Sequence, residues 1–176
     1  MTNAQFYLED LKSKFRKIDR SEYYLSYSGG KDSHLLYWFI KEYAPEFSDI
    51  KVVGINDYMQ HQEILKRIYD NADEVIMPKI KPFEVKEKYG ISCFCKNQDE
   101  MIKRYQNGSR SVNTMNFVTG VYPVFKLNVK ARDLLLNDKL HKISADCCKY
   151  LKKKPAHEYS KKNKLKPILR STRWRK

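Results

Sequence analysis

The amino-acid sequence predicts an α/β protein with an open, doubly wound parallel sheet and helices on both of its faces. The first observation is an apolar run of strand length, Tyr23–Tyr27, followed by a glycine turn and by apolar residues at helical spacing. The second is that strand and helix patterns alternate up to residue 77 with short connections, which favours parallel pairing and right-handed crossovers. The third is the length of 176 residues, which suits one α/β domain over residues 1–168, followed by a basic tail over residues 169–176.

The first half of the chain reads as a helix followed by strand, helix, strand, helix and strand. The N-terminal helix follows from apolar residues at a period near 3.6, and the later strands from short runs rich in Val and Ile. The predicted elements are a helix at 2–18, a strand at 23–27, a helix from 32 or 33, a strand at 49–55, a helix at 60–71 and a strand at 74–77.

The second half is less regular, because Pro78 and Pro82 interrupt the alternation. Polar residues 107–116 predict a loop, and the Lys-rich end predicts an exposed basic extension. The predicted elements are helices at 83–88, 98–105 and 131–136, a short strand at 142–144, and a helix at 146–152 that stops before Pro155.

Six residues between the first strand and its helix, SGGKDS at positions 28–33, suit a phosphate chain. Two adjacent glycines let the backbone turn sharply and approach a ligand without an intervening Cβ. A helix beginning at Asp32 or Ser33 directs its N–H groups and the positive end of its dipole into the turn. Ser28 and Ser33 add hydroxyl donors, and Lys31 adds a mobile positive charge. The alternative is an ordinary strand-to-helix turn with Asp32 or Ser33 as the helix cap.

The motif is not a Walker A loop, since Leu25 stands five residues before Gly30 and Asp32 follows Lys31. SGGKDS instead resembles the PP-loop, SGGxDS, of the superfamily of ATP pyrophosphatases and phosphoadenosine-phosphosulfate (PAPS) reductases. The resemblance implies a fold of the adenine nucleotide alpha hydrolase-like (HUP) type. It also implies an adenine nucleotide, namely ATP, adenylylsulfate or PAPS, with its α–β phosphate region in the loop. The nucleotide-binding residues would be Ser28, Gly29, Gly30, Lys31, Asp32 and Ser33.

For such an enzyme we expect three catalytic residues. Lys31 would offset the charge that develops at the α–β bridge, and Asp32 and Asp57 would hold Mg²⁺ or orient the nucleotide. Asp57 follows the second strand, where ligands bind in open α/β sheets, but it is equally suited to a helix cap or a turn. The family has a His-Pro-Glu triplet after this strand, and His61-Gln62-Glu63 stands in the corresponding place. A structural role for His61 is the alternative.

Three further segments are similar to phage or bacterial proteins of the PAPS reductase family: NADEVIMPKIKPFEVKEKYGI, KNQDEMIKRYQNGS and KISADCCKYLKKKP. The similarity extends from Tyr23 to about Pro167. It implies an enzyme that acts at the α phosphate or the sulfate of its nucleotide. The reaction would be ATP pyrophosphatase or adenylylation chemistry, or sulfonucleotide reduction with a thiol donor such as thioredoxin. An alternative within the superfamily is a tRNA- or DNA-sulfur-modifying enzyme.

Past residue 168 the sequence departs from the family. The family continues into a Gly-x-Arg segment, and the reductases carry a C-terminal Glu-Cys-Gly nucleophile, whereas residues 169–176 read LRSTRWRK. We expect nucleotide binding to survive this difference better than reductase turnover. A non-catalytic nucleotide-binding remnant is therefore a third hypothesis.

The four cysteines form two pairs without the spacing of a zinc ribbon. Cys93 lies in an apolar run and is expected to be buried, while Cys95, next to Lys96, is a candidate reactive thiol. Cys147 and Cys148 resemble the pair that ligates an iron–sulfur cluster in adenylylsulfate-reducing relatives. Such a cluster would need Cys93 and Cys95 as its other ligands, and the alternatives are zinc or no metal.

The net charge of +14 is concentrated at one end of the chain. Residues 149–176 carry twelve Lys or Arg against one acid, Glu158, so +11 of the total lies there. Such a segment can bind nucleic acid or simply form a solvated surface. No apolar run is long enough to span a bilayer and no signal-peptide pattern is present, so we expect a cytoplasmic protein with reduced thiols and no membrane partner.

Overall fold

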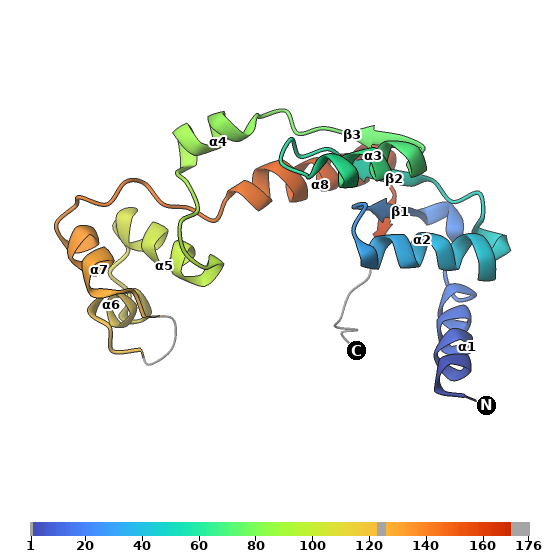
Figure 1. Cartoon of the computed structure of the whole chain (residues 1–176), viewed down its shortest axis with the longest axis horizontal. Helices are drawn as coiled ribbons and strands as arrows, with labels where there is room; N and C mark the ends of the chain where they lie inside the picture. The colour runs from blue at the N-terminus through green and yellow to red at the C-terminus, as the bar shows by residue number, and fades with distance from the viewer. Residues whose placement is uncertain (1, 123–125, 170–176) are drawn as a thin grey trace. The chain divides into compact units, whose positions relative to one another are not determined.

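A computed structural model describes residues 2–122 and 126–169, apart from the side chain of residue 4. This part of the chain contains eight α-helices and four β-strands (Figure 1). The chain divides into two compact units, where the sequence alone predicts one domain over residues 1–168. The first unit is formed by Met1–Met77 and Pro155–Lys176, and the second by Pro78–Lys154.

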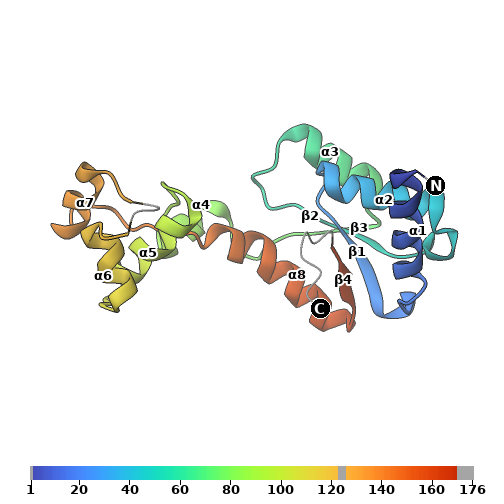
Figure 2. The same cartoon turned by 90° about the horizontal axis from the view of Figure 1, so that it is seen from below.

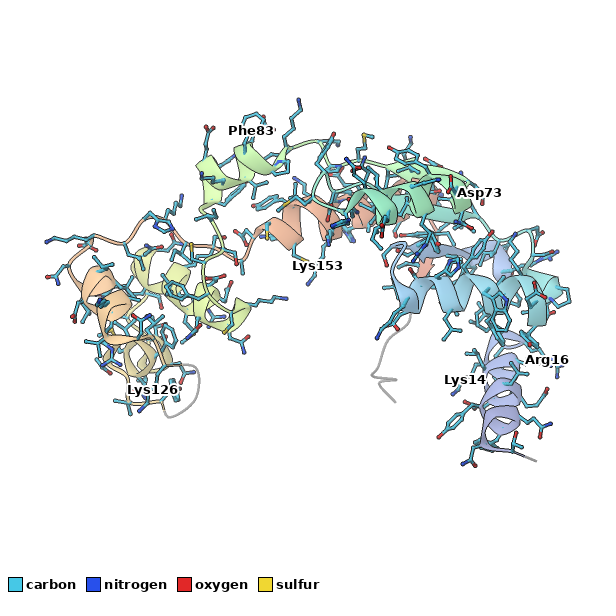
Figure 3. All side chains as sticks on the ribbon, in the orientation of Figure 1. Lys14, Arg16, Asp73, Phe83, Lys126 and Lys153 are labelled. Atoms are coloured by element: carbon cyan, nitrogen blue, oxygen red, sulfur yellow. The ribbon has the colours of Figure 1, made fainter. Side chains whose placement is uncertain are left out.

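The first unit is an α/β structure built on a four-stranded sheet. Its strands are β1 (Tyr23–Tyr27), β2 (Val52–Ile55), β3 (Glu74–Ile76) and β4 (Lys166–Ile168). They are ordered β3-β2-β1-β4, and every pair is parallel, as predicted. Asp73 joins two strands at their start, because the Val52 N–H donates to its Oδ2 at 2.7 Å and its own N–H donates to the Val52 carbonyl at 2.9 Å; Figure 3 labels this residue.

Helices cover both faces of this sheet, also as predicted (Figure 2). On one face, α1 (Asn3–Phe15), α2 (Lys31–Tyr43) and α3 (Gln62–Asn71) pack against the strands. That core contains Phe15, Leu25, Tyr27, Phe39, Ile40, Val52 and Ile68. On the other face, α8 (Lys154–Asn163) buries Tyr159 against Tyr24, with ring centroids 5.1 Å apart in an edge-to-face arrangement.

The second unit is helical. Its helices are α4 (Pro82–Tyr89), α5 (Lys96–Gln106), α6 (Val112–Thr119) and α7 (Val129–Leu136). Ile102, Phe117, Val118, Leu127, Leu135 and Ile143 form its core. The predicted strand at 142–144 is reduced to a single parallel bridge between Ile143 and Ile91.

Three sequence predictions were wrong about elements. Residues 112–116, predicted as loop, begin α6, because Ser111 caps this helix by accepting a hydrogen bond from the Thr114 N–H. The helix after Asp146 does not stop before Pro155, because residues 147 and 148 are helical and a π-helical turn, Lys149–Lys153, leads directly into α8, so that Pro155 lies within a continuous helical segment. The Lys-rich end is not simply an extension, because residues 154–168 supply α8 and β4. Of the predicted tail, residues 170–176 lie outside the described residues.

No helix among the described residues has both the length and the apolar character needed to cross a membrane.

Candidate functional site

The glycine loop, residues 28–30, connects the carboxyl end of β1 to the start of α2. The chain passes from β1 to β2 and β3 on one side, whereas β4 pairs with β1 on the other side. The order of the strands therefore reverses at β1, and open α/β sheets bind ligands beyond the carboxyl ends of the strands at such a point. The sequence motif thus lies where this architecture forms a ligand crevice.

Gly29 is required by the packing of the loop on α3. Its φ of +70° lies in the left-handed region, which favours glycine. A Cβ at this position would lie 2.8 Å from the Ile64 carbonyl oxygen and 3.0 Å from Cγ1 of Ile68. At Gly30, by contrast, a Cβ would meet only the Ser28 hydroxyl, at 3.5 Å. Gly29 therefore fixes the loop against α3, and Gly30 keeps its outer side open.

The two serines of the motif are hydrogen-bonded to each other. Ser33 Oγ donates to the Gly30 carbonyl at 3.0 Å, accepts from the Ser28 N–H at 3.2 Å, and lies 3.0 Å from Ser28 Oγ. A hydroxyl has a single proton, so Ser28 donates in the contact between the two oxygens. Ser33 thus holds the shape of the loop, while the exposed Ser28 hydroxyl can exchange its acceptor for a ligand.

The N-terminus of α2 opens at the glycine loop. Gly30 is its cap residue and offers no side-chain cap bond, and the first hydrogen bond along the helix runs from the His34 N–H to the Gly30 carbonyl at 2.9 Å. The N–H groups of residues 31–33 therefore have no carbonyl acceptor within the helix, as at every helix start. The helix dipole adds positive potential at the same place. Lys31 and Asp32 are both exposed in this first turn.

Beside this turn lies an apolar groove of about 390 Å³ within the first unit. Asp32 is one of its few polar lining residues. Apolar side chains of α1, α2 and β4, with Leu169, form most of its walls, among them Leu8, Leu11, Leu35, Leu36 and Ile168.

The structure adds Arg67 and His34 to the residues at the loop, and sequence reasoning missed both. Arg67 Nη1 donates to the Gly29 carbonyl at 3.0 Å. His34 Nδ1 lies 2.8 Å from the hydroxyl of the buried Tyr27, and its ring stacks on Tyr37. Burial raises the pKa of Tyr27, against an opposing effect of the Arg67 charge.

Only the fold could have identified Arg67, because it is 38 positions from Gly29. In the sequence it is one more polar residue on an amphipathic helix. Its helical neighbours Ile64 and Ile68 are the residues that pack on the loop, but this becomes visible only when α3 is placed on the sheet.

Asp57 follows β2, at the same edge of the sheet as the glycine loop, because β1 and β2 are adjacent and parallel. Its side chain is buried, and Oδ1 accepts from the Met59 N–H at 2.9 Å. Gln60 closes the same turn, accepting from the Asp57 N–H at 2.9 Å and donating to the Ile55 carbonyl at 2.6 Å. The turn role considered for Asp57 is therefore present, and its carboxylate is held near the crevice edge of the sheet.

His61 and Glu63 lie at the start of α3. His61 is the cap residue but makes no side-chain cap bond, and both side chains are exposed. The geometry does not place either side chain as a partner of the glycine loop.

The cysteines all lie in the second unit, Cys147 and Cys148 half-buried and Cys93 and Cys95 exposed. The expectation that Cys93 is buried was wrong, because its loop lies at the surface. Within residues 2–122 and 126–169, no group of three or more His, Cys, Asp or Glu side chains is arranged to hold a metal ion. The ligand set for an iron–sulfur cluster or zinc ion at Cys147 and Cys148 is thus not assembled in that part of the chain.

Comparison of the chain with protein-family models, with curated proteins and with solved structures finds no match.

Proposed function

We propose that the chain binds an adenine nucleotide at the glycine loop and acts at its α phosphate or sulfate, as a PP-loop enzyme of the PAPS-reductase-like group with a HUP-type sheet. The observation that carries the proposal is the position of the SGGKDS motif. It lies at the reversal of strand order and opens into the N-terminus of α2. Backbone N–H groups at such a helix start are suited to a phosphate chain.

Each loop residue has a role in this proposal. Gly30 lets the phosphates approach the backbone, and the N–H groups of residues 31–33 donate to them. Lys31 supplies a mobile positive charge, and Arg67 supplies a second one that is fixed through the Gly29 carbonyl. Such charges stabilise negative charge that develops on the bridging oxygen, which is where catalysis of this type acts.

The surroundings of the loop support the remaining parts of the nucleotide. The apolar groove at Leu35 and Leu169 is large enough for a purine base and borders the first turn of α2. Mg²⁺ is usually held by one or two carboxylates together with phosphate oxygens and water, so Asp32 and Asp57 fit it only with the nucleotide bound. The ion would neutralise phosphate charge.

Two reactions fit these groups. With ATP, an acceptor attacks the α phosphorus, pyrophosphate leaves, and the acceptor is adenylylated. With adenylylsulfate or PAPS, a thiol of a donor such as thioredoxin attacks the sulfur, and AMP or its 3′-phosphate leaves. A second thiol then releases sulfite and forms a disulfide with the first.

Isothermal titration of the full chain with ATP, adenylylsulfate and PAPS, with and without Mg²⁺, tests the proposal. We expect binding of at least one nucleotide, weakened about tenfold by Lys31→Ala through loss of a charged hydrogen bond. Lys161→Ala is the control, since it removes the same charge from α8 on the opposite face of the sheet. Absence of binding to all three nucleotides would refute the nucleotide site. Binding without release of pyrophosphate or sulfite would favour the non-catalytic remnant.

A second candidate, sulfur modification of tRNA or DNA, is favoured by a basic surface of the second unit. Tyr89 and Tyr150 stack with their centroids 4.1 Å apart. Three lysine ammonium groups lie over these rings, with Nζ 5.3–5.7 Å from a ring centroid. These lysines are Lys88, Lys149 and Lys154, and Lys152 and Lys153 are further exposed lysines of the adjoining π-helical turn; Figure 3 labels Lys153.

Binding of RNA and DNA at increasing salt tests the second candidate. Nucleic acid bound by phosphate contacts is released steeply by salt, and the slope reflects the number of contacts. Replacing Lys149, Lys152, Lys153 and Lys154 by Gln should lower that slope and weaken binding. A salt-insensitive interaction, or one unchanged by these substitutions, would count against nucleic acid.

A further inference from the structure

A cysteine and a histidine that are far apart in the sequence meet at the surface of the second unit. Cys93 Sγ lies 3.2 Å from Nε2 of His141. Both side chains are exposed, so a solute can reach the sulfur. An imidazole nitrogen at this distance can take the proton of the thiol, the step that produces a nucleophilic thiolate.

The cysteine segment is held by a buried carboxylate. Asp99, in the first turn of α5, is completely buried. Its Oδ1 accepts from the N–H groups of Cys93 at 3.3 Å and Phe94 at 3.0 Å, and its Oδ2 accepts from the Ser92 hydroxyl at 2.5 Å. Three hydrogen bonds to one acid therefore fix the backbone that carries the thiol.

The histidine segment is held by the other end of the same helix. Gln106, the last residue of α5, donates from Nε2 to the His141 carbonyl at 2.9 Å and accepts from the Ile143 N–H at 2.9 Å. The two segments also bond directly, from the Ile91 N–H to the Lys142 carbonyl at 3.1 Å. Gly90 permits this approach, because a Cβ there would lie 2.5 Å from the Lys142 carbonyl oxygen. The hydrogen bonds of Asp99 and Gln106 thus hold the two backbone segments in place and preorganise the Cys–His pair.

A second thiol lies two residues away. Cys95 is the cap residue of α5, its N–H donates to Gln98 Oε1 at 3.2 Å, and its side chain is exposed. Residues two apart have Cα atoms within about 7 Å of each other, near the upper end of the range that a disulfide spans.

We propose that Cys93, His141 and Cys95 form a thiol–disulfide exchange site for small disulfides. His141 takes the proton of Cys93, whose thiolate attacks one sulfur of the substrate; the substrate S–S bond breaks, and the departing thiolate receives the proton. Cys95 then attacks Cys93 Sγ, so that the second substrate thiol leaves with the Cys95 proton and a Cys93–Cys95 disulfide remains. The protein dithiol loses two electrons, and the substrate disulfide gains them as two thiols. The site is independent of nucleotide binding.

The reaction of the reduced full chain with glutathione disulfide, followed by peptide mass spectrometry, tests this proposal. In the wild type we expect Cys93 to react about tenfold or more faster than Cys147 or Cys148 and to end in a disulfide with Cys95. In Cys95→Ser the glutathione adduct on Cys93 should accumulate instead.

His141→Ala should slow the reaction at Cys93 about tenfold or more, and added imidazole should restore part of the rate, which a purely structural role would not allow. His61→Ala, which removes another exposed histidine, is the matched control and should react as the wild type does. An unchanged melting temperature verifies that the variants fold. Equal rates at Cys93 and the two half-buried cysteines, or no effect of His141→Ala in a folded variant, would overturn the base and nucleophile roles. A Cys93 adduct that never passes to Cys95 in the wild type would overturn the resolving role.

Discussion

At the scale of single residues, the two adjacent glycines of the loop have different functions. Gly29 combines a positive φ with contact to the α3 backbone, so both its conformation and its lack of a Cβ are needed for folding. Gly30 has φ −76° and ψ 164°, values that any residue adopts, and a Cβ there meets no backbone atom closely. In the proposed function, Gly30 serves the approach of the phosphate chain to the backbone.

This difference makes a first prediction. Gly29→Ala should lower the free energy of unfolding by at least about 2 kcal/mol, through backbone strain and overlap with Ile64. Gly30→Ala should cost about 1 kcal/mol or less, the usual effect of alanine at a helix cap, yet abolish nucleotide binding. Urea unfolding measures the first quantity and calorimetric titration the second. Equal stability losses in the two variants would contradict the division of roles.

Arg67 makes a second prediction, because it contributes a charge and a bond to the loop carbonyl. Arg67→Gln should weaken nucleotide binding about tenfold, since a charge-assisted hydrogen bond is lost. Arg67→Lys should recover only part of the affinity, because an ammonium group lacks the planar fork that reaches both the carbonyl and a phosphate.

Lys66→Gln is the matched control for these variants, because it removes an exposed charge from the neighbouring position of α3. It should leave the affinity within about twofold of the wild type, as expected for a charge screened by solvent. An Arg67→Gln affinity equal to that of the control would remove Arg67 from the site. Titration calorimetry at constant ionic strength gives all three values.

At the scale of elements, the sequence predicted those whose patterns are local. β1, the glycine loop and α2 follow from a short apolar run, two glycines and a helical apolar period, and these lie within residues 23–43. Likewise the last residue of α3 is the predicted one, and β3 ends one residue before its predicted last residue. Such elements were predictable because their burial pattern and their caps both lie in the same short stretch.

The elements that were missed depend on tertiary partners. β4 has only three residues, one of them Pro167, and is a strand because it pairs with β1 at the edge of the sheet, where a missing N–H is tolerated. α6 was predicted as a loop because residues 107–116 are polar, and its helix is stabilised where Phe117 and Val118 enter the core that also contains Ile102 of α5. Arg67 and the Cys93–His141 pair were missed for the same reason, since each joins segments that are more than thirty residues apart.

A third prediction concerns the attachment of α8 to β3. Lys51 Nζ lies 2.7 Å from Glu74 Oε2, and Tyr159 of α8 donates its hydroxyl to the same oxygen at 3.3 Å. The hydrogen bond from Lys51 lowers the pKa of Glu74 from its ordinary value of 4.5, and the hydrogen bond to Glu74 raises the pKa of Lys51. Burial raises the pKa of Tyr159.

The direction of each pKa shift determines how the free energy of unfolding depends on pH. The contribution of Glu74 is present above its ordinary pKa of 4.5 and is lost as the pH falls through the lower value of the folded state. Those of Lys51 and Tyr159 are present below their ordinary pKa values and are lost as the pH rises through the raised ones. Glu74→Gln should therefore flatten the fall in unfolding free energy below pH 4.5, as measured by urea unfolding at several pH values. Glu63→Gln, an exposed carboxylate on α3, should retain the steep wild-type dependence.

At the scale of the whole molecule, the two units have separate hydrophobic cores. Leu25, Ile40 and Ile68 belong to a cluster formed by the sheet and the helices α1–α3, while Ile102 and Leu135 belong to one formed by α5, α6 and α7. The candidate nucleotide loop lies in the first unit, and the cysteine–histidine pair lies in the second. Because each site is supported by its own core, the two activities should be separable by mutation.

A fourth prediction tests that separation. Ile102 is completely buried in the second unit, so Ile102→Ala should cost about 2–5 kcal/mol there through loss of contacts and a new cavity. Hydrogen exchange read by mass spectrometry should then accelerate in α5 and α6 but not in β1 and α2, because opening is local to a cooperative unit. Ile40→Ala, in the core of the first unit, should give the opposite pattern. The reactivity of Cys93 should change in Ile102→Ala, whereas the nucleotide affinity should change in Ile40→Ala. If either substitution instead accelerated exchange equally in both units, the chain would unfold as one cooperative body, and a loss of stability in either core would affect both sites.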